Sequence, residues 1–153
     1  MIGRVLRIAF VLRRVWMWLF RPVNLGVRMV LLQDGKVLLV RHTYMDGWHF
    51  PGGAMNRWET PVEGAAREAR EEAGAELLEP PELVGIITSY SGFKSDHVAT
   101  YICRKFRLGQ PTDRWEIAER KLFDVDDLPV ELGMVWHKML RELKENDDGG
   151  GAR

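Results

Sequence analysis

Three glutamates near the end of one short helical segment constrain this chain more than any other feature of its sequence. They belong to the stretch from residue 52 to residue 75, which reads GGAMNRWETPVEGAAREAREEAGA. At the 100° per residue of an α-helix, Glu68, Glu71 and Glu72 fall within an arc of about 100° on one side. Carboxylates gathered in this way predict a binding site for a divalent cation.

Local signals predict where this helix begins and ends. Thr60 and Glu63 form a T-x-x-E capping box, and Pro61 occupies the first helical position, where its missing N–H costs nothing. Gly74 can adopt the left-handed conformation that closes a helix. We therefore expect a helix from residue 61 to residue 73. Its inner face should consist of small or aliphatic residues, with the three glutamates off that face: Val62, Ala65, Ala66, Ala69 and Ala73.

A glutamate-rich helix is often just a solvated surface, and two observations argue against that interpretation here. The carboxylates crowd toward the negative end of the helix dipole, where they are unfavourable. Like charges four residues apart also repel, and Arg67 followed by Glu71 is the weaker orientation of an ion pair. A hard cation such as Mg²⁺ or Mn²⁺ would convert this repulsion into binding, because it prefers oxygen ligands.

The same stretch resembles the signature of the Nudix (MutT-type) hydrolases, G-x5-E-x7-R-E-U-x-E-E-x-G-U, in which U is aliphatic. Every fixed position is filled at the required spacing, by Gly53, Glu59, Arg67, Glu68, Glu71, Glu72 and Gly74. Three positions depart from what many members carry: Ala75 is smaller than usual, and Asn56 and Trp58 stand where Glu and Gly are common. These departures concern the substrate subclass rather than the metal site.

The resemblance implies a role for each matching residue. Glu68, Glu71 and Glu72 would bind the metal together with the backbone carbonyl of Gly52. The scaffold positions would brace the loop against the helix: Gly53, Glu59, Arg67 and Gly74. Members of the family hydrolyse a diphosphate bond in a nucleoside diphosphate linked to another moiety, using Mg²⁺ or Mn²⁺. The fold implied is an α/β/α sandwich around a mixed β-sheet.

Composition limits the remaining possibilities. A chain of 153 residues is expected to form one domain, and its formal net charge of zero gives no general affinity for nucleic acid. Its single cysteine, Cys103, excludes an internal disulfide and is best interpreted as a buried small residue in a reducing compartment. We therefore expect a cytoplasmic protein, and the resemblance implies a nucleotide-type small-molecule substrate.

The N-terminal segment is basic and amphipathic. Six arginines precede Asp34, the first acidic residue, and residues 1–21 are expected to form a helix with an apolar side. Its apolar runs are too short to span a membrane. Residues 1–20 could pack on their own domain, pack on a second copy in a homodimer, lie on an anionic membrane surface as a peripheral contact, or remain a mobile arm.

The remaining pattern alternates strands and loops before a final helix. We expect strands at residues 25–31 and 37–40 joined by a turn at Asp34-Gly35, a short strand at 48–50, a hairpin of 83–90 with 97–106, and a short strand at 121–125. A helix at 132–143 should end the Nudix domain, placed at residues 22–145. Residues 146–153, rich in glycine, are expected to be disordered.

Several candidate site residues lie outside the motif. A polar loop at residues 109–119 carries Glu116 and Glu119, and the resemblance implies that a glutamate in this region binds metal or acts as the base for water. Arg41 and His42 lie at the end of the strand expected at 37–40, and each could contact a substrate phosphate or form a surface ion pair. Tyr44 and Trp58, both expected on loops, could stack on a base.

The sequence thus predicts a divalent-metal-dependent nucleotide pyrophosphohydrolase. Two alternatives differ in class. One is a Nudix-fold domain that binds a nucleotide for regulation without hydrolysing it, against which the complete set of acidic positions argues. The other is a membrane-peripheral interaction protein whose N-terminal helix is the main functional element. The leaving group is not specified by the sequence.

Overall fold

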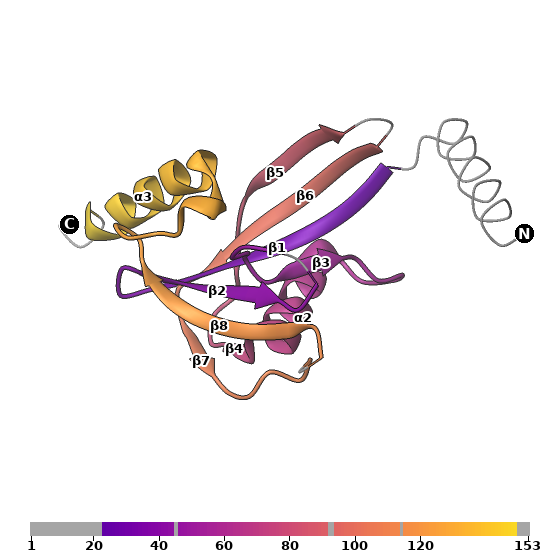
Figure 1. The fold of residues 1–153 in the computed structure, drawn as a ribbon, viewed down its shortest axis with the longest axis horizontal. Helices are drawn as coiled ribbons and strands as arrows, with labels where there is room; N and C mark the ends of the chain where they lie inside the picture. The colour runs from indigo at the N-terminus through magenta and orange to yellow at the C-terminus, as the bar shows by residue number, and fades with distance from the viewer. Residues whose placement is uncertain (1–22, 45, 92–93, 114, 150–153) are drawn as a thin grey trace, which may run out of the picture.

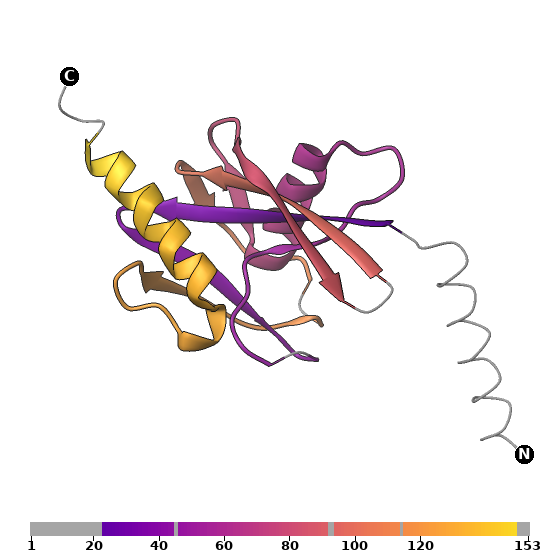
Figure 2. The same ribbon diagram turned by 90° about the horizontal axis from the view of Figure 1, so that it is seen from above.

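A mixed β-sheet lies between two helices in the computed structural model, which describes residues 23–44, 46–91, 94–113 and 115–149 (Figures 1 and 2). The predicted N-terminal helix lies outside the described residues. The helices are α2 (Pro61–Ala73), the 3₁₀ turn η1 (Val130–Leu132) and α3 (Met134–Gly149). The strands are β1 (Val23–Gln33), β2 (Lys36–His42), β3 (Gly52–Ala54), β4 (Ala75–Leu77), β5 (Glu82–Ser91), β6 (Lys94–Cys103), β7 (Phe106–Leu108) and β8 (Ile117–Asp124).

The main sheet has the order β5-β6-β1-β2-β8, with β3 paired to β1 as its sixth strand. The β1–β6 pair is parallel and the other pairs are antiparallel, so the sheet is mixed as predicted. The predicted turn between β1 and β2 is confirmed. Asp34 and Gly35 have φ angles of 52° and 70°, the two positive values that a type I′ hairpin requires.

One edge of β1 is shared by two strands, and this arrangement makes room for the site. Residues 31–33 of β1 pair with β2, whereas residues 26–28 pair with β3. Between β2 and β3 the chain leaves the sheet, and His49 contacts it only through an isolated bridge to Val40. The predicted strand at 48–50 is therefore wrong, since regular pairing begins at Gly52.

The core has two layers, which confirms the predicted α/β/α sandwich. On the α2 side, alternate residues of β1 and β2 pack against alanines of the helix; this layer contains Val27, Met29, Leu31, Leu38, Val40, Ala65, Ala69, Ala73, Ala75 and Cys103. On the other side, α3 and η1 cover Val30, Leu32, Val37, Leu39, Phe50, Ile102, Val125, Leu128, Leu132 and Leu140. Cys103 is buried and free, as expected.

In the second half of the chain, three boundaries in the structure differ from the predicted ones. The β5–β6 hairpin extends to Ser91 and Lys94, so the loop expected at 91–96 is shorter, and Phe106 begins β7 instead of ending β6. Val135, expected in the core, is 71% exposed. Helix α3 continues to Gly149, so the disordered tail predicted from residue 146 is wrong for residues 146–149. Extending an existing helix costs little until a glycine is reached.

No helix of the described residues is long and apolar enough to cross a membrane.

Candidate metal centre

Helix α2 has the predicted boundaries and caps. The side chain of Thr60 accepts a hydrogen bond from the N–H of Glu63, and the carboxylate of Glu63 accepts one from the N–H of Thr60, which completes the capping box. Gly74 closes the helix with a φ of 65°. A side chain at Gly74 would also collide with the backbone at residues 109–111, so the helix end requires glycine for two reasons.

The buried face of α2 differs from the predicted one in an important way. Gly64, Ala65, Ala69, Glu72 and Ala73 are buried, whereas Val62 and Ala66 are only partly so. Glu72 therefore lies within the inner face, although we expected it off that face. Its spacing accounts for this position, because residue 72 follows residue 65 by seven positions, within about 20° of two complete turns.

Glu72 is held against the strand that precedes the helix. The residue is 5% exposed, and its Oε2 accepts a hydrogen bond of 3.0 Å from the N–H of Gly52. Its Oε1 lies 3.8 Å from Nε2 of His42. Gly52 must be glycine, since a Cβ there would lie 2.2 Å from the carbonyl oxygen of Val27. The backbone of β3 and the carboxylate of Glu72 are thus adjacent.

The other two motif glutamates face Arg67. Nη1 of Arg67 donates to Oε1 of Glu68 at 2.8 Å and to Oε2 of Glu71 at 3.1 Å. Glu68 also lies against Gly53, where an added Cβ would come within 2.8 Å of its Oε1. In this structure the guanidinium is the cation that these two carboxylates contact.

The same guanidinium binds Glu59 through two parallel bonds, as the scaffold role requires. Nε of Arg67 donates to Oε2 of Glu59 at 3.0 Å, and Nη2 donates to Oε1 at 2.9 Å. The N–H of Asn56 also donates to Glu59, and Nη2 of Arg67 reaches the carbonyl of Ala54 at 3.2 Å. These hydrogen bonds lower the pKa of Glu59 to about 2 and raise that of Arg67. The loop between β3 and α2 is therefore fastened to the helix.

The loop before β8 brings a further carboxylate to this site. Glu116 lies just before β8, and one ligand atom each from His42, Glu72 and Glu116 lie within 4.8 Å of one another. The N–H groups of Thr112 and Asp113 donate to the carbonyl of Glu71 at 3.1 Å and 3.0 Å. These two hydrogen bonds join the C-terminal part of α2 to the loop that carries Glu116.

Glu119 does not lie in the loop, contrary to prediction. It is part of β8, where it pairs with Arg41 of β2 across the strands, and the two side chains form an ion pair of 2.8 Å at the surface. Of the two interpretations of Arg41, the structure thus shows the surface ion pair. Of the two candidate glutamates, the structure brings Glu116 to the cluster and places Glu119 on this pair.

The two aromatic residues predicted to stack on a base, Tyr44 and Trp58, also lie in different places. Tyr44 is 63% exposed, and its hydroxyl donates to Oε2 of Glu116 at 3.2 Å. Together with Arg41 and His42 it lines a pocket of about 460 Å³ beside the acidic cluster. Trp58 is fully exposed, and its φ of 69° belongs to a left-handed turn. Tyr44 is therefore placed near the cluster, whereas Trp58 projects into solvent.

His42 is the residue that the sequence interpretation underestimated. It was considered only for a phosphate contact or a surface ion pair, yet it is buried, with 6% of its surface exposed. The signal was present in the alternation of β2, since Leu38, Val40 and His42 share one face and the first two belong to the core under α2.

Burial shifts the pKa values of three groups at this site, the side chains of Glu72, Glu68 and His42. It raises the pKa of Glu72 to about 7, with a further increase from Glu68 and Glu116 and a partial decrease from the Gly52 hydrogen bond. Burial likewise raises the pKa of Glu68. For His42, burial and then the neighbouring His49 lower the pKa. The site therefore combines carboxylates that resist ionisation with a neutral imidazole.

This donor set fits a divalent cation. Among the described residues, the potential ligand atoms that lie together belong to His42, Glu72 and Glu116, and carboxylate oxygens are the ligand type that Mg²⁺ and Mn²⁺ prefer. Glu68 and Glu71 contact Arg67 in this structure. A buried carboxylate with a raised pKa is stabilised by a cation, and Nδ1 of His42 is a buried polar atom without a hydrogen-bond partner among the described residues.

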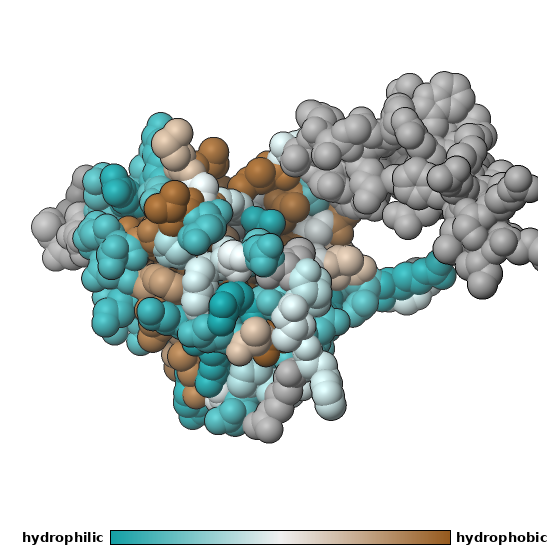
Figure 3. Space-filling view, in the orientation of Figure 1, coloured by the Kyte–Doolittle hydropathy of each residue, from teal (hydrophilic) through white to brown (hydrophobic). Residues whose placement is uncertain are grey.

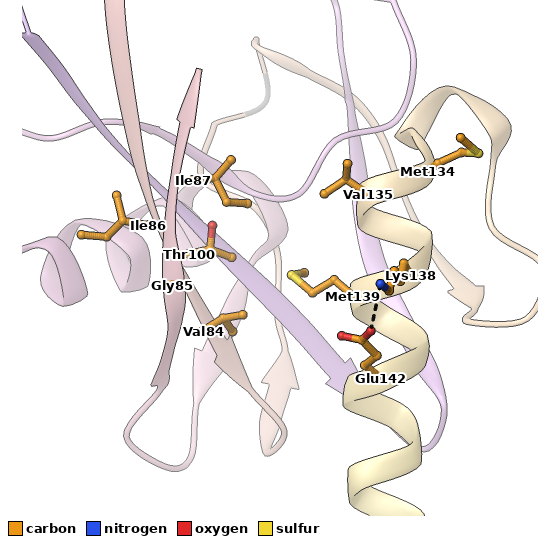
Figure 4. Close-up of a pocket in the computed structure, with 10 residues that line it drawn as sticks. All are labelled: Val84, Gly85, Ile86, Ile87, Thr100, Met134, Val135, Lys138, Met139 and Glu142. Carbon is orange, nitrogen blue, oxygen red and sulfur yellow. Dashed lines mark ion pairs between the residues drawn. The ribbon is translucent and has the colours of Figure 1, made fainter. Parts of the chain in front are cut away.

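A second, larger pocket is unrelated to this site. It has a volume of about 640 Å³ and lies between the β5–β6 hairpin and α3, on the side of the sheet opposite to α2 (Figures 2 and 4). Its lining is mainly apolar, as Ile87, Met139 and Val135 illustrate, and Lys138 and Glu142 form an ion pair of 3.8 Å along the helix. Figure 3 shows hydrophobic surface interspersed with hydrophilic residues on one face of the molecule.

The fold and the site together define a class of divalent-metal domains in which glutamates of one helix face a glycine-rich strand. The family model described as "NUDIX domain" matches residues 22–145, and the chain belongs to this family. Nudix hydrolases use divalent metals, in agreement with the carboxylate and histidine cluster.

Several curated relatives that the chain resembles bear the name RNA pyrophosphohydrolase. One from Xanthomonas oryzae pv. oryzae (strain MAFF 311018) is 52% identical over 66 residues, which cover 43% of this chain and 31% of the relative. Another, from Stenotrophomonas maltophilia (strain K279a), is 43% identical over 75 residues, covering 49% and 35%. The chain thus spans about a third of the length of these relatives.

Solved structures share the fold. A MutT NUDIX hydrolase from Burkholderia pseudomallei superposes with a TM-score of 0.68 at 22% identity, covering 78% of this chain and 97% of the other. A UDP-X diphosphatase gives 0.67 at 24% identity, with coverages of 82% and 64%. A C. elegans Ap4A hydrolase gives 0.64 at 17% identity, with 83% and 99%.

Proposed function

We propose that this chain is a divalent-metal-dependent pyrophosphohydrolase that cleaves a phosphoric anhydride bond of a nucleotide-type substrate. The observation that carries the proposal is the buried carboxylate of Glu72, bound to the N–H of Gly52 and grouped with His42 and Glu116. Burying a carboxylate costs free energy, and pairing its charged form with a cation offsets that cost.

Glu68, Glu71 and Glu72, with the carbonyl of Gly52, would hold Mg²⁺ or Mn²⁺. A bound divalent cation neutralises diphosphate oxygens and lowers the pKa of a water molecule. Arg67 and Glu59 would hold the loop against the helix, so that Gly52 stays beside Glu72.

Glu116 is the residue we assign to the attacking water. Its carboxylate is exposed at the edge of the cluster and accepts a hydrogen bond from Tyr44. In the reaction the water oxygen forms a bond to phosphorus, its proton passes to Glu116, and the bridging P–O bond breaks to release two phosphate products. Tyr44 lines the adjacent pocket, where it would contact the remainder of the substrate.

The 5′ end of RNA is the first substrate to test, because the similar proteins named above are RNA pyrophosphohydrolases. A triphosphorylated 5′ terminus contains the same anhydride bond as a free nucleotide. Recognition would be confined to the terminal nucleotides, since the zero net charge offers no general attraction to an RNA backbone.

A panel of compounds tests the proposal. Short 5′-triphosphorylated RNA, nucleoside triphosphates, nucleotide sugars, ADP-ribose and dinucleoside polyphosphates would each be incubated with Mg²⁺ or Mn²⁺, and released phosphate or pyrophosphate measured. We expect metal-dependent turnover of at least one compound by the wild type and a large loss in Glu72→Gln. Absence of turnover across the panel, in a folded protein that binds the cation, would favour the regulatory nucleotide-binding alternative.

A further inference from the structure

His42 has an unusual environment for a histidine at the end of a strand. It is the last residue of β2, and its side chain is 4% exposed. The rings of Tyr44 and His49 lie 5.2 Å and 5.7 Å from its own, centroid to centroid. The imidazole is thus enclosed between two rings and the carboxylate of Glu72.

Neither nitrogen of His42 has a satisfactory partner among the described residues. Nδ1 is buried without a hydrogen bond, and Nε2 is 3.8 Å from Oε1 of Glu72, which is beyond hydrogen-bond length. Buried polar side chains are nearly always hydrogen-bonded or bound to an ion. An imidazole that faces a buried carboxylate at this distance therefore indicates that something binds between them.

The spacing suits a shared metal ion. Ligand atoms around an octahedral cation with bonds of roughly 2.1 Å are separated by roughly 3.0 Å when adjacent and roughly 4.2 Å when opposite. The separation of 3.8 Å between Nε2 of His42 and Oε1 of Glu72 lies between these values, so a small side-chain movement would bring both atoms onto one ion. One oxygen of Glu116 and one potential ligand atom each of His42 and Glu72 lie within 4.8 Å of one another, so the carboxylate assigned to the attacking water lies beside the proposed ion.

We propose that His42 is a nitrogen ligand of the cation, together with Glu72, and that it makes the site select a first-row transition ion over Mg²⁺. The inference rests on the proposed function in using the same acidic site, but it adds a ligand from outside the glutamate motif. Mg²⁺ is a hard ion that prefers oxygen and retains its water, whereas Mn²⁺ and the later transition ions accept imidazole readily.

The direct test is to detect the nitrogen atom. Full-length protein loaded with one equivalent of Mn²⁺, without substrate, would be examined by pulsed electron paramagnetic resonance for coupling between the ion and a ligand nitrogen. We expect such coupling in the wild type, and a changed pattern when histidine is labelled with ¹⁵N. Bound Mn²⁺ without nitrogen coupling would overturn the proposal, and this result does not depend on any variant folding.

Variants then identify which of the four histidines is the ligand. The coupling should vanish in His42→Gln and in His42→Asn, and it should persist in His49→Gln, the matched control on the neighbouring ring. Two variants at residue 42 are used because it is buried, and circular dichroism would confirm the fold of each. Coupling that survives in a folded variant at residue 42 would assign the nitrogen elsewhere and exclude His42.

The affinities of the wild type and of the residue-42 variants for Mn²⁺ and Mg²⁺ test the proposal independently of the nitrogen coupling. Loss of one imidazole ligand should reduce the preference for Mn²⁺ over Mg²⁺ by roughly tenfold or more, chiefly through weaker Mn²⁺ binding. A merely structural histidine would weaken both ions alike, and that outcome would contradict the proposal.

The two proposals fail separately. If nitrogen coupling is observed but no compound of the panel is hydrolysed, the assignment of His42 stands and the proposed activity falls. If hydrolysis is observed and the bound Mn²⁺ shows no nitrogen coupling, the activity stands and the assignment of His42 falls.

Discussion

The N–H of Gly52 donates to the carboxylate of Glu72 across 20 positions of sequence, with a length of 3.0 Å. This bond joins β3 to α2 and uses one oxygen of the carboxylate, leaving the other directed toward His42. The glycine-rich strand and the glutamate helix are therefore parts of a single site.

Replacing Glu72 with Gln should separate activity from stability. The amide keeps an oxygen that can accept the Gly52 hydrogen bond, but it cannot hold a cation, so we expect turnover to fall by at least about a hundredfold in a folded protein. Steady-state kinetics on a substrate from the panel, with circular dichroism, measure the two effects. Glu142→Gln, an exposed change on the opposite face, is the control, and equal activity in both variants would refute the role of Glu72.

The stability of the metal-free protein should depend on Glu72 in a specific pH range. The folded-state pKa is about 7, above the ordinary value of 4.5, because burial disfavours the charged form. The folded state thus binds the proton more tightly, and the resulting stabilisation is complete below about pH 4.5 and is lost as the pH rises toward 7.

With chelator present, the melting temperature of the wild type should therefore fall relative to that of Glu72→Gln between pH 5 and 8, and a divalent cation should reverse the difference. If the melting temperatures of the two proteins instead change in parallel with pH across this range, burial does not raise the pKa of the Glu72 carboxyl group.

Glu116 and Glu119 form a matched pair for testing the base. Glu116→Gln should lower kcat more than KM, because the lost interaction with water matters mainly in the transition state. Glu119→Gln should have little effect, since this residue forms a surface ion pair with Arg41. If both variants retain near-normal kcat, the base lies elsewhere.

Arg67 should not be replaceable by lysine. Its guanidinium bonds simultaneously to Glu59, Glu68 and Glu71, and the compact ammonium of lysine cannot reproduce this fork. We expect Arg67→Lys to lower both the melting temperature and the turnover, whereas Arg70→Lys, exposed on the same helix, changes neither. Thermal denaturation and kinetics of the two variants provide the comparison, and equal behaviour would argue against the bracing role.

Removal of residues 1–20 should leave hydrolysis unchanged. Every residue assigned to the site lies between residues 41 and 119, and the removed segment contains no carboxylate or histidine. The deletion should instead alter melting temperature, oligomeric mass or binding to anionic vesicles, according to whether the segment packs on its domain, on a second copy or on lipid. A large fall in kcat/KM in the folded truncation would contradict this expectation.

The sequence predicted those parts of the fold that depend on local chemistry. The limits of α2 follow from Thr60, Pro61 and Gly74, and the first hairpin follows from Asp34 and Gly35, whatever packs around them. The motif likewise predicted that Glu59 and Arg67 would contact each other.

Features that depend on distant packing were not predicted. The burial of Glu72 and His42 results from the way α2 crosses the end of β2. The extent of β8 was missed because both faces of this edge strand are largely exposed, so its sequence lacks apolar alternation. Glu119 was consequently assigned to a loop, although β8 pairs with β2 at this residue and Glu119 lies opposite Arg41.

The two hydrogen bonds from Thr112 and Asp113 to the carbonyl of Glu71 have a consequence for anyone who wishes to redesign this domain. The loop before β8 cannot be exchanged as an independent module, because two of its backbone N–H groups are bonded to the C-terminal part of α2. The turn around Trp58 is a better place for a grafted or randomised sequence, since that side chain projects into solvent while Glu59 anchors the turn from beneath.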